Sequence, residues 1–296
     1  MTKQLKIGVI GIPGKWSTET LADAIEAKTG YRLVIDMADC HLDLRTQSLF
    51  YQGVDLSTLD ALIIKKISQT YSPSMLDRIE LLRVPESKGV KIFSPPESII
   101  RLVDRLSCTI TLNQANIPMP ETVITEDIEA AVDCVNDFKS TVFKPLFSTK
   151  ARGMTIIDSD LSDKKIKAKI SEFKKHNQMM YIQKKINLPG HDMGLVFLAG
   201  EYLGTYARVN QGDSWNTTIH SGGKYMNYQP SQEIIDMAKS AQEPFKLDYT
   251  TVDVAETDTG PIVFEVSAFG GFKGALEGIG INAAELYTDY VIQQLN

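Results

Sequence analysis

The chain has 296 residues, of which 43% are hydrophobic and 23% are charged, as is ordinary for a globular protein of about two domains. Acidic residues outnumber basic ones, 37 to 31, and the resulting net charge of −6 argues against a general nucleic-acid binder. No apolar run is long enough to span a bilayer, and no signal-peptide core precedes the first strand-like run. The three cysteines are widely spaced and form no zinc pattern, so we expect a cytoplasmic protein without membrane or nucleic-acid partners.

The first hundred residues alternate between strand and helix patterns. Strands are predicted over residues 6–10, 31–35, 61–64 and 90–93, and helices over residues 18–28 and 75–82. Strands that alternate with helices at this spacing predict a parallel sheet with crossover helices. Ser94-Pro-Pro-Glu97 then predicts a capped helix that reaches about Ala115.

The rest of the chain has an α+β pattern. Predicted strands cover residues 141–145, 154–157, 180–183, 194–198, 202–209, 251–254 and 262–266. Predicted helices cover residues 163–176, 234–245 and 282–295. The first two of these strands are expected to form a hairpin, and the last two are expected to flank a tight Asp-Thr-Gly turn.

Three glycines, Gly8, Gly11 and Gly14, lie at the first strand and the turn after it, and they suggest a dinucleotide-binding site. Their spacing is GxxGxxG, whereas the dinucleotide fingerprint is GxGxxG. Asp36 is only a weak candidate for a ribose contact. A tight turn at the sheet edge is the favoured interpretation, and a nicotinamide-dependent oxidoreductase stays open as an alternative.

Two later segments could hold a nucleotide. Lys144 ends a strand before a polar loop, and a lysine with the backbone N–H groups of such a loop can surround a phosphate chain. The loop candidates are Ser148, Thr149 and Gly153. The segment from Tyr181 to Ile186 is a candidate adenine-binding hinge, formed by Gln183, Lys184, Lys185 and Ile186.

Two carboxylates, Asp253 and Glu265, lie inside apolar strand-forming runs, where an unpaired charge would be costly to desolvate. On adjacent antiparallel strands they could share a hard cation such as Mg²⁺, which prefers carboxylates together with nucleotide phosphates. A structural salt bridge to arginine or lysine fits the spacing equally well.

Taken in chain order, the lysine strand, loop, hinge and two carboxylates resemble the ATP-grasp superfamily, over residues 103–280. Within it the chain is most similar to the RimK-like glutamate and amino-acid ligases. The resemblance implies an α/β and α+β fold, with a Rossmann-like pre-ATP-grasp domain (1–98) and an ATP-grasp domain (99–296). The latter would consist of a phosphate-loop subdomain (104–185) and a C-terminal metal-binding subdomain (186–296).

The resemblance also assigns roles to individual residues. Arg105, where the family usually has lysine, would hold ATP phosphates, and Asp192 would contact the nucleotide. Arg208 would lie near the reacting phosphate and act catalytically. Ser267 would join Asp253 and Glu265 as a metal ligand, in place of the usual asparagine.

Other departures fall in the part of the family that receives the second substrate. Gly194 replaces an expected arginine, and Lys184-Lys185 replaces a common acidic–aromatic pair. The segment Ile219–Gly223 resembles the family's His-x-Gly-Gly turn, but the preceding residues lack the expected arginine and asparagine. The Ser-Ala-Phe-Gly-Gly-Phe run that starts at Ser267 resembles the ATP-grasp proteins of the GAK system, which co-occur with a kinase-like partner.

The function implied by the resemblance is an ADP-forming ligase that joins a carboxylate to an amine through an acylphosphate. Its cofactors would be ATP and Mg²⁺, with Mn²⁺ as a substitute. Its partners would be a small-molecule or peptide carboxylate and an amino-acid-like amine, and it could assemble as a homo-oligomer. A degenerate nucleotide binder, the oxidoreductase and a scaffold protein without a small-molecule site remain alternatives.

Overall fold

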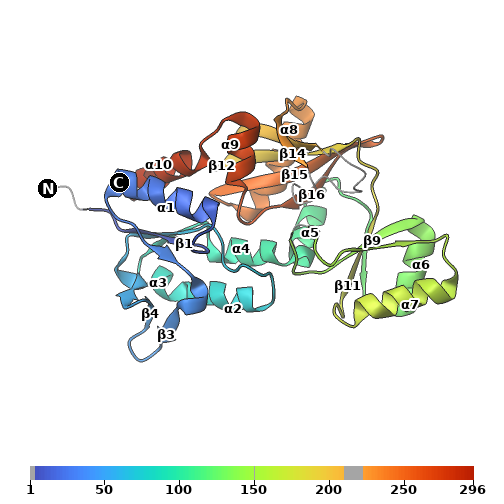
Figure 1. Ribbon diagram of the computed structural model, residues 1–296, viewed down its shortest axis with the longest axis horizontal. Helices are drawn as coiled ribbons and strands as arrows, with labels where there is room; N and C mark the ends of the chain where they lie inside the picture. Colours follow the sequence, from blue (N-terminus) through green and yellow to red (C-terminus); the bar gives the residue numbers. More distant parts are fainter. Residues whose placement is uncertain (1–3, 150, 210–222) are drawn as a thin grey trace.

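The N-terminal part of the computed structural model is a parallel sheet covered by helices (Figure 1); the structure describes residues 4–149, 151–209 and 223–296. The strand order is β2-β1-β6-β7, and every neighbouring pair is parallel, as predicted. The strands are β1 (Ile7–Ile10), β2 (Val34–Ile35), β6 (Ala61–Ile64) and β7 (Lys91–Phe93). The helices are α1 (Trp16–Thr29), α2 (Ser74–Leu81) and α3 (Arg83–Ser87). β1 and β6 are buried along their whole length, which explains their unbroken apolar sequences.

A small antiparallel sheet follows β2, and the sequence did not predict it. It consists of β3 (His41–Asp43), β4 (Ser48–Tyr51) and β5 (Val54–Asp55), flanked by single 3₁₀ turns at Met37–Asp39 and Leu56–Thr58. Strands of two to four residues are too short to show a reliable hydrophobic period.

The single helix expected from Ser94 to about Ala115 is wrong, because the chain breaks at Asp104. Helix α4 (Pro96–Val103) ends there, and α5 (Arg105–Gln114) begins with Asp104 as its N-cap, accepting a 3.0 Å hydrogen bond from the Leu106 N–H. The cap predicted at Ser94 is also wrong. Pro95 is the N-cap of α4, and the Ser94 hydroxyl instead accepts a hydrogen bond from the Asp248 N–H.

Residues 122–184 form a lobe with its own hydrophobic core, which projects from the rest of the molecule in Figure 1. Its antiparallel sheet has the order β10-β9-β11-β8. The strands are β8 (Thr122–Thr125), β9 (Ser140–Lys144), β10 (Thr155–Asp158) and β11 (Met180–Lys184), and the helices are α6 (Ile128–Phe138) and α7 (Asp163–Lys174). The predicted hairpin is confirmed as β9–β10, whereas β8 and α6 were missed.

The C-terminal part is a five-stranded antiparallel sheet of order β14-β13-β12-β15-β16. The strands are β12 (His191–Leu198), β13 (Glu201–Val209), β14 (Lys224–Asn227), β15 (Tyr249–Thr257) and β16 (Gly260–Val266). The helical segments are α8 (Gln232–Gln242), a 3₁₀ turn (Glu243–Phe245), α9 (Phe272–Ile279) and α10 (Ala283–Leu295). The strands predicted here are confirmed, although most are longer than expected and β14 was missed.

The last helix returns to the N-terminal part. Tyr287 and Val291 of α10 share a hydrophobic cluster with Leu21 and Ile25 of α1, and Lys28 pairs with the partly exposed Asp289. The first and last parts of the chain therefore share a core, and the domain boundaries at 98/99 and 185/186 stay predictions. Among the described residues, no helix is long and apolar enough to cross a membrane.

Candidate active site

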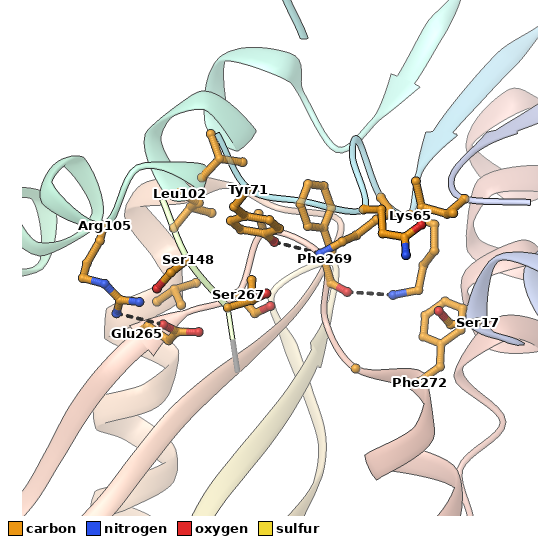
Figure 2. A pocket seen from close by; sticks show the side chains of 18 of the residues that line it. Ser17, Lys65, Tyr71, Leu102, Arg105, Ser148, Glu265, Ser267, Phe269 and Phe272 are labelled. Carbon is orange, nitrogen blue, oxygen red and sulfur yellow. Dashed lines mark hydrogen bonds and ion pairs between the residues drawn. The ribbon is translucent and has the colours of Figure 1, made fainter. Parts of the chain in front are cut away.

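A cavity of about 640 Å³ opens where the N-terminal sheet, α4–α5 and the end of β16 meet. Five of the residues selected from the sequence line it: Arg105, Ser148, Thr149, Glu265 and Ser267. Figure 2 shows Arg105, Ser148 and Glu265 on one side of this pocket, Lys65 and Ser17 on the other, and Tyr71 and Phe269 between them. Segments far apart in the sequence thus contribute to a single cavity.

Arg105 occupies a central position because the break at Asp104 places it in the first turn of α5. Its Nη1 lies 3.4 Å from Glu265 Oε2, and its Nε donates to the carbonyl of Pro145 at 3.4 Å. The guanidinium also lies over the ring of Tyr181, and only 11% of the side chain is exposed. A single buried cation thereby connects the polar loop after β9 with a carboxylate of β16.

The loop after β9 brings polar groups to the same cavity. Ser148 Oγ is buried without a hydrogen-bond partner in the part of the chain that the structure describes, although buried hydroxyls are normally bonded. Thr149 and Arg152 line the cavity beside it, and the Arg152 N–H donates to the Thr149 carbonyl at 3.3 Å. Gly153 has φ +70°, so it provides a left-handed turn that returns the chain to β10.

Lys144, at the end of β9, is buried, and its ammonium donates to the side-chain oxygen of Gln183 on the neighbouring strand β11. Burial, followed by repulsion from Arg105, lowers the pKa of Lys144 to about 7, while Glu265 acts in the opposite direction. An anion that binds near Lys144 would therefore stabilise the charged form of this lysine. Neither Lys144 nor Gln183 lines the cavity directly.

Two backbone N–H groups of the predicted adenine-binding hinge already form hydrogen bonds within the fold. The Lys184 N–H donates to the Glu121 carbonyl and the Lys185 N–H to the Ser140 carbonyl, both at 2.9 Å. These two N–H groups are therefore not available to an adenine ring. In residues 184–186, the candidate donor to the ring is then the Ile186 N–H. The Lys184 ammonium pairs with the exposed carboxylate of Glu121.

Arg208 lies in strand β13, next to the middle strand β12, and pairs with two carboxylates. Its Nε is 3.1 Å from both oxygens of Asp192, directly opposite on β12, and its Nη1 is 3.2 Å from Asp253 Oδ1 on β15. Only 17% of Arg208, 8% of Asp192 and 19% of Asp253 are exposed. Glu201, at the start of the same strand, lies opposite Leu198 and near Lys239.

The two candidate metal carboxylates lie side by side, because Asp253 of β15 pairs in register with Glu265 of β16. Burial raises the pKa of Asp253 to about 7 although Arg208 lowers it, and Glu265 and Asp192 raise it further. Asp192 and Asp253 share Arg208, and Glu265 pairs with Arg105, so a cation bound beside Asp253 and Glu265 would favour their charged forms.

Asp253 and Glu265 both have arginine partners, as the salt-bridge alternative expected. No group of three or more His, Cys, Asp or Glu side chains arranged for a metal occurs among the described residues. The donors present are two carboxylates and a serine hydroxyl, the oxygen ligands that Mg²⁺ takes together with phosphate and water oxygens. The Ser267 hydroxyl faces the same cavity, and the Ser267 N–H is fixed to the Thr251 carbonyl at 2.8 Å.

The replacement of arginine by glycine at position 194 has a packing explanation. A Cβ on Gly194 would lie 2.4 Å from the ring of Tyr206, which is opposite it on β13. The same ring also lies against Gly274 of α9, where an added Cβ would approach it to 2.4 Å, and the Tyr206 Cβ lies against Gly278, where an added Cβ would approach it to 2.5 Å. The Tyr206 ring fills the space over Gly194 and holds α9 against the sheet, so no larger side chain fits there.

The glycine-rich turn after β1 does not have the features of a nicotinamide site. A Cβ on Gly11 would lie 2.5 Å from Thr18, so this glycine permits close packing of the turn on α1. Asp36 is used locally, since its carboxylate accepts the Ala38 N–H at 2.9 Å.

Lys65, Lys66 and Tyr71 belong to the cavity and were missed in the sequence. Lys65 and Lys66 come directly after β6, and the only local signal is two charges at the carboxyl end of a buried parallel strand. By contrast, the predicted His-x-Gly-Gly turn lies mostly outside the described residues, as does the segment Asn210–Thr218.

Comparisons with known proteins agree with this architecture. A family model described as RimK-like ATP-grasp domain matches residues 103–291. Tetrahydromethanopterin:alpha-L-glutamate ligase of Methanosarcina acetivorans is 26% identical over 318 residues, covering 97% of this chain and 98% of that protein.

Two solved structures share the fold. A structure of the ATP-grasp ligase PsnB complexed with minimal precursor, Mg and ADP has a TM-score of 0.74 at 18% identity, and each chain is covered over 100%. The RimK domain protein ATP-grasp from Sphaerobacter thermophilus also gives 0.74, at 19% identity, covering 96% of this chain and 98% of that one. The expected mixed α/β ATP-grasp fold is therefore confirmed, and with the family model matching well over half of its length, this chain belongs to the RimK-like ATP-grasp family.

Proposed function

We propose that this protein is an ATP-dependent ligase that joins a carboxylate to an amine through an acylphosphate, with release of ADP. The observation that carries the proposal is the cavity in which the Arg105–Glu265 pair meets the partnerless hydroxyl of Ser148. A cation, a carboxylate and a loop with an unused hydroxyl are the groups needed to bind a phosphate chain together with its metal. Two of the relatives named above, the Methanosarcina acetivorans protein and PsnB, are ligases, which supports the same reaction class.

The roles follow from position. Arg105 and Lys144 would hold ATP phosphates, and the loop residues Ser148, Thr149 and Gly153 would close over them and exclude water, which protects an acylphosphate from hydrolysis. A bound Mg²⁺ would neutralise phosphate charge, and Asp253, Glu265 and Ser267 would hold it. Ile186, with the side chains of Gln183, Lys184 and Lys185 nearby, would border the base.

Arg208 would stabilise negative charge at the reacting centre, and Asp192 would hold it there from the opposite strand rather than contact the nucleotide. A donor that acts on charge developing in the transition state contributes about 3–4 kcal/mol, or two to three orders of magnitude in kcat. Arg208→Lys keeps the charge but loses the two-carboxylate geometry. It should therefore lower kcat much more than the affinity for ADP.

The proposal is tested first by ligand-induced stabilisation. A ligand at 100 times its Kd adds about 2.7 kcal/mol to the stability of the folded state, so Mg-ATP and Mg-ADP should raise the melting temperature while NAD should not. Stabilisation by NAD instead would favour an oxidoreductase, and no stabilisation by any of them would favour a scaffold.

Turnover is then tested with a panel of carboxylic acids and amino acids, by measuring ADP and phosphate release. Glu265→Gln should abolish release while the protein remains folded, because it removes charge without changing volume. Glu256→Gln is a matched control on the same sheet, with 41% of its side chain exposed against 46% for Glu265, and it lies outside the cavity. Nucleotide binding without acceptor-dependent ADP release would identify a degenerate ATP-grasp protein.

A further inference from the structure

We propose that Tyr181 is a positioning residue of the phosphate site, which holds Arg105 and Lys144 at a fixed separation through its ring and its hydroxyl group. The inference rests on the proposed function, because it takes these two cations to bind the nucleotide phosphates. Tyr181 is not among the described residues that line the cavity. It would therefore act through Arg105 and Lys144, without touching the nucleotide itself.

The pairing of strands in the lobe places Tyr181 next to Lys144. Tyr181 of β11 pairs with Lys144 of β9, and Gln183 of β11 pairs with Thr122 of β8. Side chains two residues apart on a strand point to the same face of the sheet, so Tyr181 and Gln183 share a face, and Ile182 points the other way into the lobe's core. Tyr181 and Gln183 are only 2% and 3% exposed, and their polar groups must therefore find partners within the protein.

The hydroxyl groups of Tyr181 and Thr122 together orient the amide of Gln183. Gln183 Nε2 donates to Thr122 Oγ1 at 3.1 Å and to the Tyr181 hydroxyl at 3.2 Å. Both N–H donors of the amide are then used, and its oxygen is left to accept the hydrogen bond from the Lys144 ammonium. Loss of the Tyr181 hydroxyl would free one of these N–H groups and loosen the amide that holds Lys144.

Tyr181 also contacts helix α5 at two successive turns. Its hydroxyl forms a 2.9 Å hydrogen bond with Thr109 Oγ1, and its ring centre lies 5.9 Å from the guanidinium carbon of Arg105. Residues four apart lie on the same face of a helix, so Arg105 and Thr109 meet the same side chain, and a guanidinium at this distance is attracted to the face of an aromatic ring. Tyr181 thereby connects α5, which carries Arg105, to the sheet that carries Lys144; Figure 1 shows α5 beside this lobe.

A restraint between the two cations is needed because they repel each other when no phosphate lies between them. Burial, followed by repulsion from Arg105, lowers the pKa of Lys144 to about 7. The lobe that carries Lys144 has its own hydrophobic core, so it could move away from α5 as a unit. Tyr181 opposes this separation, and a site that is already ordered before the nucleotide arrives loses less free energy to ordering when it binds.

The experiment measures the Kd of Mg-ADP and of adenosine, by displacement of a fluorescent ADP analogue. Tyr181→Phe keeps the ring and loses the hydroxyl, Thr109→Val removes the hydroxyl on α5, and Thr109→Ser keeps a hydroxyl there. We expect Tyr181→Phe and Thr109→Val each to lower the preference for Mg-ADP over adenosine at least fivefold, because only Mg-ADP carries phosphates. The Kd of adenosine should change less than twofold, and Thr109→Ser should retain the preference of the unaltered protein.

Tyr202→Phe is a matched control. It removes a tyrosine hydroxyl that likewise bonds a threonine, Thr205 Oγ1, at 2.7 Å, and Tyr202 is not among the described residues that line the cavity. The preference for Mg-ADP should be unchanged in this variant.

An unchanged preference in Tyr181→Phe or in Thr109→Val would overturn the proposal. An equal loss of affinity for both ligands would also overturn it, since a general disturbance of the fold does not distinguish phosphates from the nucleoside. Failure of the unaltered protein to bind Mg-ADP would refute the proposed function as well, whereas binding that is insensitive to these substitutions would refute only the role of Tyr181. Thr109→Val leaves the buried tyrosine in place, so the test does not depend on whether Tyr181→Phe folds.

Discussion

Replacing Arg208 with methionine should destabilise the protein strongly, because the guanidinium is the shared partner of two buried carboxylates. Methionine keeps much of the apolar stem but removes the guanidinium that donates to Asp192 and Asp253, which are only 8% and 19% exposed. Removing one partner of a buried ion pair costs about 3–5 kcal/mol, since the remaining charge is left desolvated. With a shift of about 2–4 °C per kcal/mol for a protein of comparable size, the melting temperature should fall by roughly 10 °C.

Two controls show where this loss of stability comes from. In Arg208→Met/Asp192→Asn, one of the two uncompensated carboxylates is neutral, so the double variant should recover a substantial part of the loss. Arg83→Met removes an arginine of an exposed pair with Glu80, with 70% and 56% of the side chains accessible, and should cost less than about 1 kcal/mol. Urea unfolding of all four proteins provides the comparison. A loss in Arg208→Met no larger than that in Arg83→Met would refute the reasoning.

Three further predictions concern packing, the loop and pH. Gly194→Ala should cost about 1–3 kcal/mol of stability, because its Cβ would lie 2.4 Å from the Tyr206 ring; denaturant unfolding equal to that of the unaltered protein would contradict this. Trypsin cleavage at Arg152 should be suppressed by Mg²⁺ and a non-hydrolysable ATP analogue, and equal cleavage with and without it would count against a phosphate-covering loop. Burial raises the pKa of Asp248, whose carboxylate accepts a hydrogen bond from the Tyr290 hydroxyl. Asp248 therefore makes its full contribution to the stability of the folded state below the ordinary pKa of aspartate, and this contribution is lost as the pH rises through the raised pKa of the folded state. Asp248→Asn should therefore gain stability relative to the unaltered protein as the pH rises above the ordinary pKa of aspartate, and a difference that does not change with pH would disprove the assignment.

Local sequence patterns predicted much of the framework. The buried runs 7–10 and 61–64 are parallel strands, as the alternation of short apolar runs with helices predicted. The Asp-Thr-Gly turn also predicted that the strands of Asp253 and Glu265 are adjacent and antiparallel, but the direct pairing of these two residues depends on a register shift between Asp253 and Val254 that the sequence did not show. The single helix predicted over residues 94–115 was wrong because the capping signal of Asp104 was overlooked. An aspartate can cap a helix as readily as it can lie within one.

What only the tertiary structure decided is which charged side chains meet. The sequence singled out Arg208 but not its partners, since Asp192 and Asp253 lie 16 and 45 residues away and are brought to it by the pairing of three strands. Nothing local shows that Gly194 makes room for the Tyr206 ring, or that the lysines after β6 reach the loop at Phe269. Hydrophobic period and turn chemistry depend on neighbours along the chain, and so the sequence by itself indicated the family and many of the elements, but not short strands such as β3, β4 and β5. Contacts among charged groups depend on register and on the crossing of distant segments, and so the fold alone determined the cavity and its electrostatics.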